Sequence, residues 1–198
     1  MFISLFILSL IINLETGLKK ELQNNAKVLR GGDFEVDTRT KQINPNFLNE
    51  LKKKSIVSST IEFSTMLTGS LTDETNAFFI RLKAVDDQYP LYGRVFSEPQ
   101  NAMQRLQSEV NTIVVNRKIF ETLNLKVNDT VYVKQAPFKV VGYVETVPDL
   151  GRALLFGDFA IVSNRAFEKL NVTSIGSFVN YEYKVKAPNE DALKFVYE

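Results

Sequence analysis

The sequence contains no histidine and no cysteine among its 198 residues. The lack of histidine excludes the usual general base, the Ser-His-Asp triad and every imidazole metal site. The lack of cysteine excludes thiol nucleophiles, thiolate zinc sites and disulfides. Acid–base chemistry would have to rest on Asp, Glu, Lys or Tyr alone. We therefore expect a protein that is not an enzyme, with no catalytic, cofactor-binding or metal-ligating residues.

An excess of charge of one sign is also missing. The chain carries 24 Lys and Arg against 23 Asp and Glu, for a net charge of +1. Non-specific binding to phosphates needs a strongly basic surface, so we expect no nucleic-acid partner. The longest basic run is Lys52-Lys53-Lys54. It falls where a helix should end, and we interpret it as a solvated last turn that complements the helix dipole.

An apolar run opens the chain, but it is too short to span a membrane. Residues 1–12 include only Ser4 and Ser9 as polar residues, whereas a spanning helix needs about 20 apolar residues. A signal peptide would carry a basic segment before the run and a small-residue cleavage site after it, and neither is present. A buried core segment would show an amphipathic period. We favour the third interpretation, the outer end of a transmembrane helix that starts before this sequence.

Beyond the apolar run, the spacing of apolar residues predicts that the helix continues as a stalk. The residues that recur every three or four positions are Leu14, Leu18, Leu22, Ala26 and Leu29. Gly31-Gly32 is expected to end the helix, because glycine readily takes the left-handed conformation of a helix C-terminus. Residues 1–31 are thus predicted to be the end of a transmembrane helix followed by a stalk.

The rest of the chain alternates strand and helix patterns with short connections. Strands are expected at 33–37, 56–67, 77–85, 112–115, 130–133, 138–144, 159–162 and 177–186. Helices are expected to open at Asn44-Pro45, at Asn116, at Ser163 or Asn164, and at Pro188. A turn is expected at 73–76 and a hairpin at 134–137. This order predicts an α+β fold with a mixed sheet flanked by helices.

The strand pattern at 77–85 is a strict alternation. Phe78, Ile80, Leu82 and Ala84 share one face, while Phe79, Arg81 and Lys83 share the other. Alternation of this kind predicts a half-buried strand whose second face is solvated.

Two segments resemble a known family closely. Residues 18–36 read LKKELQNNAKVLRGGDFEV, and residues 82–93 read LKAVDDQYPLYG. They are similar to the junction after the first transmembrane helix, and to a YPLYG segment, in ABC-transporter permeases of the MacB/FtsX-like type. Residues 123–131 (LNLKVNDTV) and 147–149 (VPD) resemble two further turns of that family. Asn124 and Asn128 stand where the family usually has Gly, and Asn is the next-best residue for a left-handed turn.

The resemblance implies a MacB-like periplasmic core domain, most similar to permeases associated with a lysophospholipase-type esterase. It implies two subdomains. A membrane-proximal, porter-like part would comprise 32–86 and a truncated second half at 156–198, and an inserted β-rich part would comprise 87–155. We also expect the reading frame to encode further apolar spans after Glu198.

The function implied is that of a permease subunit in the bacterial inner membrane, with this domain facing the periplasm. It would couple ATP hydrolysis by a separate cytoplasmic ABC ATPase to export or extraction of hydrophobic or lipid-like cargo. A second permease copy and a periplasmic esterase are the other expected partners, and no cofactor binds this chain. The alternatives are a lipoprotein-releasing permease subunit, a regulator of a periplasmic hydrolase, an anchored hydrolase using carboxylates, and an anchored binding module.

Three motifs invite a functional interpretation, and for each we prefer a structural one. Gly31-Gly32-Asp33 follows a helix and precedes a strand, the reverse of the order found in phosphate-binding loops. Asp86-Asp87 could be a cation site or a catalytic pair, but fits a solvated turn at the end of a strand. Residues 89–93 (YPLYG) are expected to form a packed crossing between subdomains, with contact to lipid or substrate as the alternative.

Overall fold

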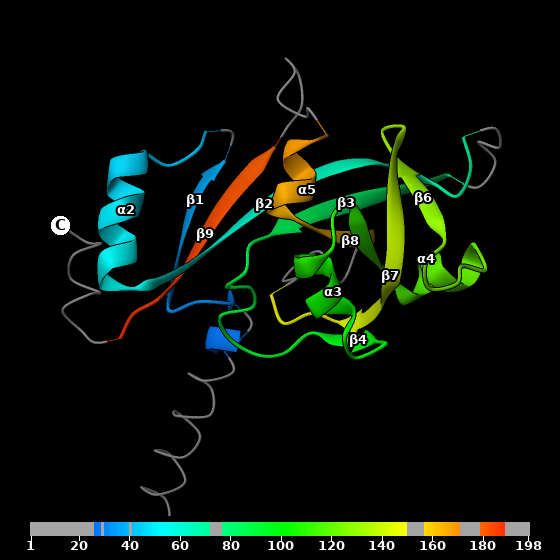
Figure 1. Cartoon of the computed structure of the whole chain (residues 1–198). Helices are drawn as coiled ribbons and strands as arrows, with labels where there is room; N and C mark the ends of the chain where they lie inside the picture. Colours follow the sequence, from blue (N-terminus) through cyan, green and yellow to red (C-terminus); the bar gives the residue numbers. More distant parts are fainter. Residues whose placement is uncertain are drawn as a thin grey trace, which may run out of the picture.

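The computed structural model describes residues 26–28, 30–39, 41–71, 77–149, 157–170 and 179–188. The apolar run at 1–12, most of the predicted stalk, the turn at 73–76 and the helix expected after Pro188 lie outside these residues. Within the described ranges, no helix has the length and apolar character needed to cross a bilayer. Figure 1 shows the arrangement of the described elements.

The described residues form an α+β fold whose strands belong to one mixed sheet, as predicted. The strands are β1 (Phe34–Arg39), β2 (Ile56–Thr68), β3 (Ala77–Val85), β4 (Phe96–Glu98), β5 (Thr112–Asn116), β6 (Thr130–Val133), β7 (Ala136–Thr146), β8 (Asp158–Ser163) and β9 (Asn180–Lys186). The helices are α2 (Pro45–Lys54), α3 (Ala102–Ser108), α4 (Arg117–Thr122) and α5 (Asn164–Glu168).

Six strands close into a barrel in the order β2-β3-β8-β5-β7-β6. The ring closes because β6 pairs with β7 along its length and with the end of β2 at Leu67 and Thr68. The pairs β3–β8 and β5–β7 are parallel, and the other four pairs are antiparallel. Closure protects edges that an open sheet would expose. The barrel takes β2, β3 and β8 from one side of the predicted subdomain division and β5, β6 and β7 from the other.

The barrel is filled by the inward-facing residues of its strands. These are mainly Phe63, Leu67, Ile80, Leu82, Ile113, Val115, Val131, Val133, Phe138, Val140, Ala160 and Val162. Successive side chains of a strand point to opposite faces, so the alternation seen in the sequence places these residues together. Helices α4 and α5 add Ile119 and Phe167 to this core, while α3 covers the outside of the barrel through Leu106 and a second apolar cluster.

Strands β9 and β1 extend the sheet beyond the barrel, beside α2 (Figure 1). Phe34 at the start of β1 lies opposite Val185 near the end of β9. The backbone N–H of Asp33 also donates a hydrogen bond to the carbonyl of Val185 (2.8 Å). The chain therefore enters and leaves this part of the fold side by side.

The predicted start and stop signals at Gly31, Asn44, Asn116 and Ser163 are confirmed. Gly31 has φ +71°, and its N–H donates to the carbonyl of Val28 (3.2 Å), which ends the helical residues before it. Asn44 caps α2 by accepting the N–H of Asn46 (2.9 Å). Asn116 and Ser163 cap α4 and α5 in the same way. Asn124 and Asn128 have φ of 49° and 81°, so both take the left-handed conformation expected of them.

Two elements and one burial pattern differ from the prediction. Strand β4 was not predicted because three residues are too few to show a period. Helix α3 was not predicted because it lacks the side-chain cap that marks the shorter helices α4 and α5. The expected solvated position of Lys83 is wrong: this side chain is 2% exposed. Its burial comes from a distant segment that covers the outer face of β3, as described below.

Candidate functional site

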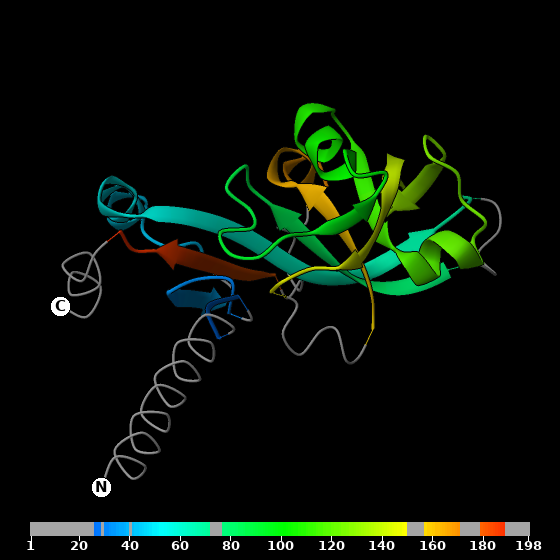
Figure 2. The same cartoon turned by 90° about the horizontal axis from the view of Figure 1, so that it is seen from below.

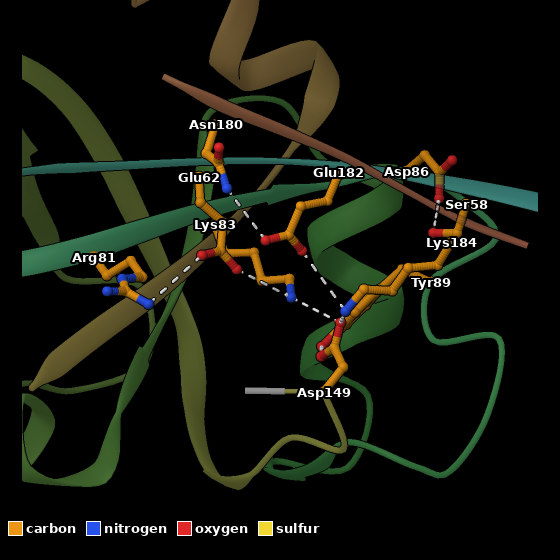
Figure 3. A network of polar contacts seen from close by, with 10 residues as sticks. All are labelled: Ser58, Glu62, Arg81, Lys83, Asp86, Tyr89, Asp149, Asn180, Glu182 and Lys184. Carbon is orange, nitrogen blue, oxygen red and sulfur yellow. Dashed lines mark hydrogen bonds and ion pairs between the residues drawn. The ribbon is translucent and has the colours of Figure 1, made fainter. Parts of the chain in front are cut away.

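A buried ionic cluster lies where β3, β9 and the turn after β7 meet (Figure 3). The carboxylate Oδ2 of Asp149 lies 2.7 Å from Nζ of Lys83 and 2.8 Å from Nζ of Lys184. Its other oxygen, Oδ1, accepts a hydrogen bond from the hydroxyl of Tyr89 at 2.5 Å. The three charged side chains are 1–5% exposed. A single carboxylate thus holds three segments that are distant in sequence.

Two carboxylates from the sheet complete the cluster. Oε1 of Glu62 on β2 lies 3.2 Å from Nζ of Lys83, and Oε2 of Glu182 on β9 lies 3.7 Å from Nζ of Lys184. Half-exposed Arg81 lies 3.8 Å from Glu62 at the rim. Buried charges are tolerated when they are paired and hydrogen-bonded. Every buried lysine here has two carboxylate neighbours.

The pairing sets the charge states of the cluster. Burial alone would raise the pKa of Asp149, but the charges of Lys83 and Lys184 outweigh it and hold that pKa well below its usual range. Burial alone would lower the pKa of Lys83, but Asp149 and Glu62 outweigh it, so the pKa is raised. Burial and then the charge of Glu62 raise the pKa of Glu182. Both shifts favour the ionised forms of Asp149 and Lys83 at neutral pH.

The end of the N-terminal helix joins the fold beside this cluster. Oδ1 of Asp33 lies 2.7 Å from Nζ of Lys27. Its Oδ2 accepts hydrogen bonds from the hydroxyl of Tyr92 and from the N–H of Ala187, both at 2.9 Å. Burial opposes ionisation of Asp33, but these partners outweigh it and lower its pKa. Asp33 thus ties the last helical turn to the YPLYG segment and to the end of β9. Figure 2 shows this end of the sheet from below, with β1 in blue beside β9 in red.

At the same junction, side chains pack closely against two glycines. A side chain at Gly31 would place its Cβ 2.8 Å from Cβ of Asp149 and 3.0 Å from Cδ of Lys184. A side chain at Gly93, where φ is +78°, would place its Cβ 2.7 Å from Cβ of Pro148 and 3.1 Å from Cγ1 of Val28. Only glycine allows approaches this close. The turn at 147–149 is consequently wedged between the helix end and the sheet.

The motifs singled out in the sequence take structural positions. Gly31-Gly32-Asp33 follows a helical turn and leads into β1, which begins at Phe34. In the YPLYG segment, Tyr89 and Tyr92 direct their hydroxyls to Asp149 and Asp33, so both aromatic residues join distant segments. Lys52, Lys53 and Lys54 form the exposed last turn of α2, as expected.

Asp86 and Asp87 do not form a carboxylate pair. The carboxylate of Asp86 accepts hydrogen bonds from the hydroxyl of Ser58 (2.7 Å) and the N–H of Ser59 (2.6 Å). Asp87 is exposed, and its Oδ1 lies 3.9 Å from Nη2 of Arg165. Only Asp87 therefore fits the solvated turn that was expected, while Asp86 ties β2 to the end of β3. Across the residues that the structure describes, no group of three or more acidic side chains is placed to hold a metal ion.

The ionic cluster itself was not found from the sequence. The VPD turn attracted attention only through its resemblance to the family. Lys184 falls in a predicted strand for which no buried charged residue was expected. A lysine on the polar face of an alternating strand normally points to solvent. The single available signal was that Lys83, Asp149 and Lys184 each lie in or beside segments expected to be strands.

Comparison with known proteins gives one sequence relative and several similar structures. No family model matches the chain. The chain is 27% identical over 187 residues to the uncharacterised ABC transporter permease YbbP of Escherichia coli K12. That alignment covers 91% of this chain but only 22% of the permease. The chain thus corresponds to about a fifth of its relative's length.

The similar structures are extracytoplasmic domains of transporters. The periplasmic region of MacB from Actinobacillus actinomycetemcomitans matches with a TM-score of 0.51 and 14% identity, covering 79% of this chain and 71% of that one. The extracellular domain of the ABC-type transporter YknZ from Gram-positive bacteria matches with a TM-score of 0.50 and 15% identity, covering 77% of each chain. The fold, a mixed sheet with flanking helices, is that of MacB-like periplasmic domains.

Proposed function

We propose that this chain is the extracytoplasmic domain of an ABC-transporter permease subunit in a bacterial inner membrane, facing the periplasm. The observation that carries the proposal is the likeness to one permease over nearly the whole chain. The shared fold of MacB-like periplasmic domains agrees with it. On this proposal the domain is not catalytic, and it binds no cofactor of its own.

The geometry of the chain ends suits a domain inserted into a membrane protein. Phe34 and Val185 lie opposite each other on β1 and β9, so the segments before and after the domain start from one place. A helix leading in and a helix leading out can then cross the membrane side by side. In this arrangement, residues 1–12 are the outer end of the first membrane helix, and the rest of the predicted stalk connects it to Gly31.

The junction described above gives a path for force. A separate cytoplasmic ATPase would move the membrane helices, and the last helical turn would transmit that movement through Asp33 and through the packing of Val28 against Gly93. The closed barrel resists deformation, because its core is packed from all six strands. The domain would then move as a rigid body against a second permease copy and open or close a space for hydrophobic or lipid-like cargo. A periplasmic esterase is the partner that would receive or modify such cargo.

The hydrolase alternative has no support from the site geometry. It requires paired carboxylates able to share acid and base roles, whereas Asp86 is held by Ser58 and Ser59 and Asp87 faces Arg165. The carboxylates that do lie together, Glu62, Asp149 and Glu182, are paired with buried lysines.

The proposal is tested by purifying the tagged full-length protein from native membranes in mild detergent. We expect it to bring with it an ABC ATPase subunit and a second copy of itself, and we expect the complex to hydrolyse ATP. A matched preparation with a substitution in the ATP-binding lysine of the ATPase should show the same assembly without hydrolysis. A protein that purifies alone, with no ATPase, contradicts the proposal.

A further inference from the structure

The carboxylates around the two buried lysines come from two different parts of the fold. Glu62 and Glu182 belong to β2 and β9, and therefore stay with the sheet that carries Lys83 and Lys184. Asp149 belongs to the turn after β7 and reaches the cluster from outside the sheet. The turn can therefore move without carrying the other two carboxylates along.

Each lysine keeps a partner if Asp149 is withdrawn. Lys83 lies 3.2 Å from Glu62, and Lys184 lies 3.7 Å from Glu182, in the same structure that shows both lysines bound to Asp149. An unpaired buried lysine would be strongly unfavourable. Because the sheet supplies a substitute for each contact, withdrawal of Asp149 leaves no such lysine.

Movement of the turn would also release the end of the N-terminal helix. Pro148 packs against Gly93, which packs against Val28 of the helix, and Asp149 packs against Gly31. Tyr89, four residues before Gly93, is held by Asp149 through its hydroxyl. The turn and the YPLYG segment thus join the helix end to the barrel, and Asp149 is the carboxylate that contacts both Gly31 and Tyr89.

We infer that the turn at 147–149 is a latch with two positions. In the closed position seen here, Asp149 bridges Lys83 and Lys184 and locks the helix end to the barrel. In the open position, Lys83 pairs with Glu62 and Lys184 with Glu182, and the turn leaves with Tyr89. The latch rests on the proposed function only for its biological use, which is to let the barrel change its angle to the membrane helices.

A double-mutant cycle on the full chain tests the exchange of partners. The variants are Asp149→Asn, Glu62→Gln and both together, compared by denaturant unfolding. Each single variant leaves Lys83 with one carboxylate, whereas the double variant leaves it with none. We expect the double variant to raise the unfolding constant at least about tenfold beyond the product of the single effects, within the range of measured coupling between neighbours.

The matched control pairs Asp149→Asn with Asp158→Asn. Asp158 accepts from Lys118 (2.9 Å) and shares no partner with the cluster, so the two effects should multiply without coupling. If the effects of Asp149→Asn and Glu62→Gln on the unfolding constant also multiply without coupling, the sheet carboxylates do not substitute for Asp149. The proposed latch is then wrong.

Hydrogen exchange locates the opening. In Asp149→Asn, we expect at least about tenfold faster exchange in the peptides containing Gly31 and residues 89–93, with unchanged exchange in β5 and β7. Equal acceleration across the barrel would show that Asp149 only supports global stability, and would overturn the latch. If Asp149→Asn does not fold, Tyr89→Phe removes one of the contacts of Asp149 and should give the same local pattern with smaller amplitude. These measurements need no ATPase, so their outcome is independent of the permease proposal.

Discussion

At the scale of single residues, burial separates two ion pairs that look alike in sequence. Lys83 and Lys118 each lie within 3 Å of an aspartate, at 2.7 Å and 2.9 Å. The side chain of Lys83 is 2% exposed, and that of Lys118 is 68% exposed. Exposed pairs contribute little because water and salt screen them, whereas breaking a buried pair leaves an uncompensated charge.

Substitution of the two lysines by methionine measures this difference. We expect Lys83→Met to lower the free energy of unfolding by about 3 kcal/mol. The buried carboxylates Asp149, Glu62 and Glu182 then lose one of the lysines that compensate their charge. We expect Lys118→Met to change it by less than about 1 kcal/mol. Urea unfolding of both variants checks the prediction, and equal losses would show that the cluster contributes no more than a surface pair.

Glu182 predicts a dependence of stability on pH. Its pKa in the folded state is raised above the ordinary value, first by burial and then by the charge of Glu62. A carboxyl group whose pKa is raised in the folded state stabilises the fold at pH values below its pKa in the unfolded state. That stabilisation is lost as the pH rises through the pKa of the folded state. Above its folded-state pKa, ionised Glu182 therefore costs stability.

Glu182→Gln should remove that cost. We expect a melting temperature higher by roughly 2–4 °C at pH 7, the shift that about 1 kcal/mol gives in a chain of this size. The gain should vanish below about pH 4, where the wild-type carboxyl is also neutral. Thermal unfolding between pH 4 and 7 measures it, with exposed Glu168→Gln as the control that should show no such trend. A gain that persists at low pH would contradict the assigned charge state.

The residue scale is also where sequence reasoning was weakest. Asn124 and Asn128 were assigned correctly, since a left-handed turn requires a particular type of residue at a particular place. Lys83 was not, because its burial depends on Asp149, 66 positions away along the chain. Local alternation shows which side chains share a face, but not what later covers that face.

At the scale of elements, strands of four or more residues could be predicted, and the three-residue strand β4 could not. The expected strands at 77–85 and 130–133 agree with β3 and β6 at both ends. Strand β4 and helix α3 depend instead on packing against β7, through the backbone around Gly142. A Cβ at Gly142 would lie 2.5 Å from the carbonyl oxygen of Glu98 and 2.8 Å from Cβ of Ala102.

Gly142→Ala tests whether this close approach holds β4 and α3 in place. The added methyl group cannot fit against the backbone of Glu98, so we expect a loss of stability of about 1–3 kcal/mol, as for overpacking in a core. Gly157→Ala is the matched control, because no atom lies within 4 Å of a Cβ at that position. Denaturant unfolding of both variants gives the comparison, and equal stability would mean that β4 and α3 do not depend on the contact at Gly142.

At the scale of the whole molecule, the fold class followed from the order of elements, but the closed barrel did not. The ring is closed by two residue pairs between β2 and β6, Leu67–Val133 and Thr68–Tyr132. These strands are more than 60 residues apart by their numbers, and nothing in their local patterns marks them as neighbours. The division into two subdomains stays a prediction, although the barrel draws strands from both sides of it.

The proposed function requires the domain to move as a rigid body when an ATPase drives the permease. These 198 residues contain no cysteine. Once any cysteines elsewhere in the complex are replaced, spin labels can be attached to cysteines introduced at Val110 and Val127, which are 66% and 36% exposed. The measurement is the distance between labels in the full-length permease with its ATPase, compared with and without trapped ATP. The account predicts that the distance between Val110 labels on two copies changes with nucleotide, while the distance between Val110 and Val127 within one copy does not. Two results would contradict the proposal. One is a distance between copies that is the same with and without nucleotide, and the other is a nucleotide-dependent distance between Val110 and Val127 within one copy.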